Sequence, residues 1–164
     1  MGVDPGSRKT GVGIIEINGD RIIPVYFDAI NAGTGEFTQR LGTIFSELQQ
    51  LIKEHQPDQA AIETVFVAHN AASAIKLGQA RGAAVCAAIS CDVPVSEYSP
   101  RSIKQAIVGR GGADKTQVQH MVGLLLGIKG PIQNDAADAL AVALCHQHTS
   151  HTLARMNMMQ GSKA

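Results

Sequence analysis

The stretch GVDPGSRKTGVGIIEINGDRIIPVYFDAI, residues 2–30, opens the chain with the pattern of a β-hairpin. Residues 10–17 and 21–30 are rich in β-branched and other apolar side chains, and the turn sequence Asn-Gly-Asp at 18–20 separates them. A turn of this type between two such segments predicts a pair of antiparallel strands. A short strand before them, residues 2–4, extends the same sheet.

Alternating helices and strands are predicted downstream of the hairpin. Apolar residues recur at helical spacing from Phe37 until Pro57, which predicts a helix that ends before the proline. Asn70 is a suitable N-cap for a second helix, rich in Ala and Gly, that runs to about Ser90. The other expected elements are strands at 59–63 and 94–98 and helices at 101–108, 115–126 and 134–148. This order predicts an α/β fold with a mixed central sheet flanked by helices.

Composition limits the class of protein. The chain has 164 residues, of which 45% are hydrophobic, and this predicts one domain with a real core at residues 1–148. The polar, aperiodic residues 149–164 predict a disordered tail. The three cysteines form no CxxC pair, which indicates a reduced, cytoplasmic protein. The apolar runs are well short of the ~20 residues of a membrane span, so we expect no membrane partner.

Four carboxylates stand where apolar segments meet turns or helix starts. Asp4 ends the first strand, and Glu63 ends an otherwise apolar strand, where an unpaired charge is costly. Asp135 and Asp138 are three residues apart and therefore share one face of a helix. Oxygen ligands of this kind select hard cations such as Mg²⁺. We therefore expect metal-assisted attack on a phosphodiester. Taken alone, Asp4 could simply begin a turn, and Asp135 could simply interact with the helix dipole.

Several ordered motifs resemble the RuvC family of Holliday-junction resolvases. They are Gly2-Val-Asp-Pro-Gly-Ser-Arg8, Ala61-Ile-Glu63 followed by Val65-Phe66, Leu77-Gly-Gln-Ala-Arg-Gly82, Lys104-Gln-Ala-Ile-Val-Gly109, Ala113-Asp-Lys115 and Asp135-Ala-Ala-Asp138-Ala-Leu-Ala. The resemblance extends to about His148. It implies an RNase H-like fold and a homodimer that cuts opposed strands of four-way junction DNA during recombination and repair, leaving 5′-phosphate and 3′-hydroxyl ends. It also implies cooperation with the branch-migration complex of RuvA and RuvB.

The resemblance assigns roles residue by residue. Asp4, Glu63, Asp135 and Asp138 match the catalytic metal ligands of the family, which would hold two Mg²⁺ ions, or Mn²⁺ in their place, about 3.5 to 4 Å apart.

Phe66 matches an aromatic residue that stacks on bases near the cut, and Lys104 and Lys115 match basic positions that face the scissile strand. Relatives tend to have Lys or Arg where this chain has His69, so we expect DNA affinity to increase as the pH falls toward 6. From sequence alone, a buried Phe66 and solvated lysines are ordinary alternatives.

Other functions were weighed against the nuclease. ATPases of the actin and Hsp70 type also begin with a strand, an Asp-x-Gly motif and a hairpin, but they need two such domains around a nucleotide. A non-catalytic junction-binding protein with structural acids is the second alternative. The loop at 108–116 lacks the Gly-Lys-Thr ending of a P-loop. The Ala/Gly face of the helix that follows Asn70 is the candidate dimer seam, unless it packs on its own sheet.

Overall fold

The structure, a computed structural model, describes residues 1–64 and 70–161. Within these residues the five strands are β1 (Gly2–Asp4), β2 (Lys9–Asn18), β3 (Arg21–Asn31), β4 (Ala60–Glu63) and β5 (Val95–Tyr98). Its helices are α1 (Phe37–His55), α2 (Ala71–Ile89), α3 (Pro100–Val108), α4 (Lys115–Leu125) and α5 (Asn134–Gly161). The predicted hairpin and the predicted helices and strands are all present, with small differences at their ends, except that α5 continues 13 residues beyond position 148.

The strands form one mixed sheet in the order β3-β2-β1-β4-β5. The pairs β1–β2 and β2–β3 are antiparallel, whereas β1–β4 and β4–β5 are parallel. A register shift between Ile14 and Ile15 leaves an extra residue on β3 near Pro24. Proline and a bulge are tolerated there because β3 is an edge strand. The expected mixed sheet is confirmed.

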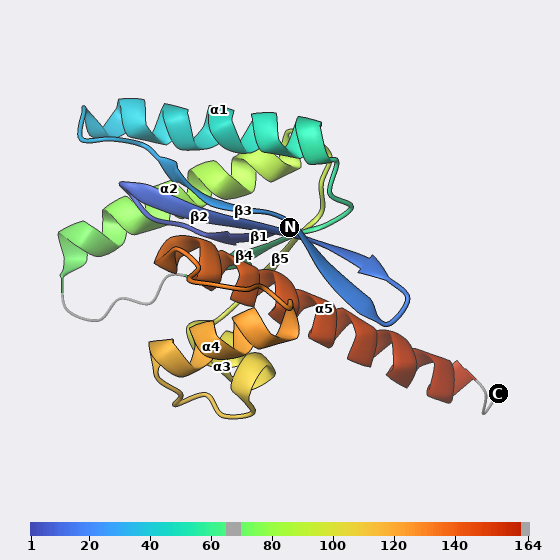
Figure 1. Cartoon of the computed structure of the whole chain (residues 1–164). Helices are drawn as coiled ribbons and strands as arrows, with labels where there is room; N and C mark the ends of the chain where they lie inside the picture. The colour runs from blue at the N-terminus through green and yellow to red at the C-terminus, as the bar shows by residue number, and fades with distance from the viewer. Residues whose placement is uncertain (65–69, 162–164) are drawn as a thin grey trace.

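Helices cover both faces of the sheet, which gives three layers (Figure 1). Helices α1 and α2 pack on one face over a core that includes Val12, Ile44, Leu48 and Ile62. Helices α3, α4 and α5 cover the other face over a second core that includes Val122, Leu140 and Leu144. Among the helices that the structure describes, none combines the length and the apolar character needed to cross a bilayer.

The alanine face of α2 packs inside its own chain. Ala80, Ala84, Ala87 and Ala88 are all buried, in the core shared with α1 and the sheet. These four alanines therefore follow the alternative expectation, because they let α2 lie close to its own neighbours, and the dimer seam stays a prediction for the rest of the Ala/Gly face. Another stripe of α2 remains at the surface, at helical spacing: Ile75, Gly78, Gly82, Cys86 and Ile89.

Residues 149–161 differ from the expectation of a disordered tail. Helix α5 continues to Gly161 and extends beyond the sheet (Figure 1). Within it, the hydroxyls of Thr149, Ser150 and Thr152 donate to the carbonyls four residues earlier, at 2.8, 2.7 and 2.7 Å. These polar side chains are thus satisfied by the helix itself. Their polarity therefore did not indicate disorder.

Candidate active site

Asp4 and Glu63 lie side by side because they end adjacent parallel strands. The pairing of Gly2 with Ala61 and of Val3 with Ile62 brings the ends of β1 and β4 to the same edge of the sheet. Both carboxylates are half-buried, and their side chains share a hydrogen bond. Burial raises the pKa of Asp4 to about 8, with further contributions from the charges of Glu63 and Asp138. Burial also raises the pKa of Glu63, although the hydrogen bond with Asp4 opposes this change.

Helix α5 supplies the other two acids, and glycines on the sheet allow its close approach. A Cβ atom on Gly11 would lie 1.9 Å from the carbonyl oxygen of Asp135, and one on Gly2 would lie 2.2 Å from that of Ala139. Only glycine fits where a helix backbone touches a strand in this way. The contact brings the first turn of α5 against β1 and β2, so that Asp138 lies near enough to raise the pKa of Asp4 and of Glu63.

Asp135 is held by a neighbour that the sequence analysis did not single out. The Gln133 side chain donates to Asp135 Oδ2 at 2.6 Å and accepts a hydrogen bond from the Ala136 backbone N–H at 2.8 Å. Gln133 therefore caps the start of α5 and orients Asp135 at the same time. Its position just before the Asp-Ala-Ala-Asp motif was the available signal, since side chains at this point commonly satisfy the first N–H groups of a helix.

Two lysines share a small cavity with these acids. The cavity has a volume of about 190 Å³, and Glu63, Lys104, Lys115 and Asp138 are among the residues that line it. Lys115 Nζ lies 2.5 Å from Asp138 Oδ2. Burial raises the pKa of Glu63, and the charge of Lys104 is among the smaller effects that oppose this rise. Both predicted lysines therefore lie beside the carboxylates, whereas Phe66 and His69 fall outside the described residues.

The donor set suits a hard divalent cation. Carboxylate oxygens are the ligands that Mg²⁺ and Mn²⁺ prefer, and burial, together with the charges of Glu63 and Asp138, raises the pKa of Asp4 despite the opposing charge of Lys115. Within residues 1–64 and 70–161, no three His, Cys, Asp or Glu side chains have the spacing of a finished metal site. Two of the four acids are bonded to other side chains: Asp138 to Lys115 and Asp135 to Gln133.

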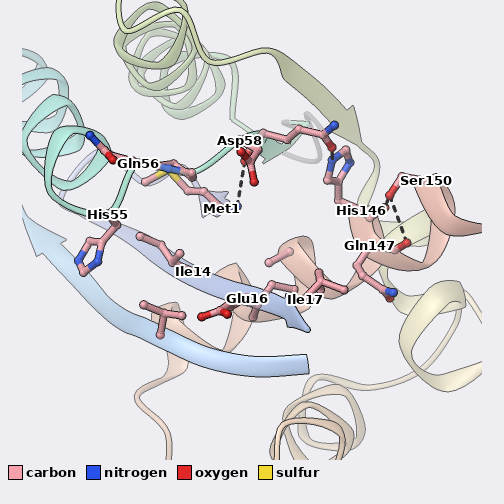
Figure 2. A pocket seen from close by; sticks show the side chains of 15 residues that line it. Met1, Ile14, Glu16, Ile17, His55, Gln56, Asp58, His146, Gln147 and Ser150 are labelled. Atoms are coloured by element: carbon pink, nitrogen blue, oxygen red, sulfur yellow. Dashed lines mark hydrogen bonds between the residues drawn. The ribbon is translucent and has the colours of Figure 1, made fainter. Parts of the chain in front are cut away.

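Figure 2 shows a larger cavity, of about 560 Å³. Its walls include Met1, His55 and His146. His146 Nδ1 lies 2.8 Å from the Tyr98 hydroxyl, and its Nε2 lies 2.6 Å from Gln59 Oε1. Both ring nitrogens thus bond to protein groups. Because the cavity contains none of the four predicted acids, its size does not make it the site of the chemistry.

Comparison with known proteins decides the family. The model of the family described as "Crossover junction endodeoxyribonuclease RuvC" matches residues 1–146. The chain belongs to the RuvC family. A RuvC from Xanthomonas oryzae pv. oryzae (strain MAFF 311018) is 54% identical over 154 residues, which are 93% of this chain and 88% of that protein. A RuvC from Methylococcus capsulatus is 50% identical over 159 residues, covering 97% and 96%.

Solved RuvC structures share the fold. Thermus thermophilus RuvC superposes with a TM-score of 0.84 at 31% identity, covering 92% of this chain and 94% of that one. The same protein in complex with a Holliday junction substrate gives a TM-score of 0.86 at 32% identity, covering 92% and 93%. The yeast mitochondrial resolvase Ydc2, at 11% identity and a TM-score of 0.73, shares the fold. These matches confirm the predicted family, the RNase H-like fold and the nuclease class.

Proposed function

We propose that this RuvC protein cuts four-way junction DNA by metal-dependent hydrolysis of a phosphodiester in each of two opposed strands. The observation that carries the proposal is the Asp4–Glu63 pair at the ends of adjacent parallel strands, with Asp138 facing it from α5. The nuclease family and a relative solved with a Holliday junction substrate support the same reaction.

Asp4, Glu63, Asp135 and Asp138 are the residues proposed to hold two Mg²⁺ ions, with Mn²⁺ as a substitute. Bound metal would supply an activated water and charge stabilisation at the leaving 3′ oxygen, which gives 5′-phosphate and 3′-hydroxyl ends.

The other groups of the site prepare it for substrate. The proton on the Asp4–Glu63 pair must leave before both carboxylates can act as ligands. The hydrogen bond from Gln133 holds the Asp135 carboxylate in place at the start of α5. Lys104 and Lys115 place positive charge in the cavity where a backbone phosphate would approach, and each such contact adds about one unit to the salt slope of binding. Phe66 and His69 are proposed as further DNA contacts from the family motif.

A homodimer would provide one active site for each strand of the junction. The exposed stripe of α2, defined above, is the proposed seam, because Ile75 is 64% and Ile89 is 59% exposed. Large apolar side chains in a row on a helix commonly mark an interface, and the two glycines between them would let a second helix approach.

Family membership supports cooperation with RuvA and RuvB. It also supports a cytoplasmic location, with which the three free cysteines agree.

The deciding experiment is incubation of a synthetic four-way junction with Mg²⁺, scored for symmetric nicks that ligase can seal. Asp4→Asn and Asp138→Asn should abolish cutting and leave junction affinity largely intact, whereas Asp20→Asn, in the hairpin turn, should cut normally. Cutting by either site variant at the normal rate would contradict the proposed ligands. Binding without cutting by the unaltered protein would favour the non-catalytic alternative, and ATP binding by calorimetry would favour the ATPase.

A further inference from the structure

Lys115 reaches from one helix to the acids of another. It is the first residue of α4, whose N-cap Asp114 accepts a hydrogen bond from the Gln117 backbone N–H at 2.8 Å. From there its ammonium group lies 2.5 Å from Asp138 Oδ2 on α5. The side chain is 56% exposed and that of Asp138 is 21% exposed. The lysine therefore approaches the site from the solvent side.

The same ammonium group interacts with all four carboxylates. Its hydrogen bond to Asp138 raises the pKa of Lys115 most, and the charges of Asp4 and Asp135 raise it further. The positive charge of Lys115 in turn opposes the rise in the pKa of Glu63 that burial causes. Lys104 lines the same cavity, but among the described residues it forms neither an ion pair nor a hydrogen bond with these acids. Of these two lysines, Lys115 is thus the one that bonds directly to an acid of the cluster.

We propose that Lys115 is a built-in counter-ion, which occupies Asp138 in place of a divalent cation and must leave that carboxylate when the cation binds. This inference rests on the proposed metal site. The four acids repel one another in the absence of metal, and a positive group held against Asp138 reduces this repulsion. A metal ion and the ammonium group cannot both use the same Asp138 oxygen.

Displacement of Lys115 needs no change of fold. Val118 and Val122 anchor α4 in the core beneath α5, whereas the Lys115 side chain is mostly solvated. Rotation of this side chain would free Asp138 and leave the ammonium group at the mouth of the same cavity. The ion pair thus competes with metal, so its removal should increase the affinity of the DNA-free protein for a divalent cation.

The test is a titration of the full chain with Mn²⁺, read by the electron paramagnetic resonance signal of the free ion, without DNA. Lys115→Met removes the charge and the ion pair together. Lys104→Met is the matched control, because it removes the same charge from the same cavity without breaking a bond to Asp138. Lys115→Gln serves as a second neutral variant should Lys115→Met fail to fold, and circular dichroism checks each protein.

We expect both Lys115 variants to bind Mn²⁺ about tenfold more tightly than the unaltered protein, and Lys104→Met less than about threefold more tightly. Equal or weaker binding by the Lys115 variants would overturn the counter-ion role, as would an equally large gain in Lys104→Met. Asp138→Asn separates this result from the proposed function. If that variant binds Mn²⁺ as well as the unaltered protein does, the metal site itself is wrong.

Discussion

Asp4→Asn should make the metal-free protein more stable at alkaline pH. Burial and the nearby acids raise the pKa of Asp4 from 3.8 to about 8, so the folded protein holds a proton there that the unfolded chain releases. For an acid with a raised pKa, stability is complete below about pH 4 and falls as the pH rises. The loss levels off above about pH 8, where both states are ionised. Asparagine has nearly the same shape and carries no charge.

The expected gain can be worked from these values. A pKa that moves from 3.8 to about 8 lowers the free energy of unfolding at pH 8 by about 6 kcal/mol, because each pKa unit corresponds to about 1.4 kcal/mol. The asparagine amide can still donate a hydrogen bond to the Glu63 carboxylate, but the two carboxyl groups titrate together, so only about half of this free energy belongs to Asp4 alone. A net gain of about 3 kcal/mol should therefore be seen at pH 8.

Urea unfolding followed by circular dichroism, at several pH values from 5 to 8.5 in EDTA, measures this gain. The difference between Asp4→Asn and the unaltered protein should increase steadily with pH. Added Mg²⁺ should reduce the difference, because only the unaltered protein has the full set of ligands. Asp20→Asn, at an exposed turn, should show no such pH dependence. A difference that does not change between pH 5 and 8.5, or an Asp4→Asn protein less stable at pH 8, would refute the reasoning.

Three further results are expected. Gly11→Ala should lower the free energy of unfolding by more than about 2 kcal/mol and slow junction cutting, because the new Cβ would lie 1.9 Å from the Asp135 carbonyl oxygen. Gly42→Ala is the control for urea unfolding, because a Cβ at that position would meet nothing within 4 Å. Gln133→Ala should reduce the free energy of unfolding by about 1 kcal/mol, as expected for a lost helix cap, and should slow cutting without changing junction affinity. A loss of junction affinity as large as the loss of cutting rate would contradict the proposed role of Gln133 in orienting Asp135. Ile75→Glu should shift sedimentation of a micromolar sample toward monomer, and an unchanged profile would exclude this stripe as the seam.

The strands, helices and family could be predicted because their signals are local in the sequence. The Asn-Gly-Asp turn lies between β2 and β3, and the period of apolar residues from Phe37 to Ile52 defines α1. Asp4 and Glu63 could be named as candidate ligands because each ends a predicted strand, whereas their pairing became known only from the parallel contact of β1 with β4. The polarity of the tail and the small residues of α2 did not settle the conformation of the tail or the packing of α2, because both depend on neighbouring elements. Residues 149–161 are polar yet helical, and the α2 alanines pack inward.

The sequence by itself therefore determined the elements and the family and named the four candidate acids, because residue spacings of 2 or 3.6 and short motifs are local features of the chain. Only the tertiary structure decided how close the groups come. The approach of α5 over Gly2 and Gly11, and the contact of Lys115 with an acid 23 residues away, follow from the packing of separate elements. Such contacts depend on ångström-scale distances between backbones, and no periodic pattern encodes them.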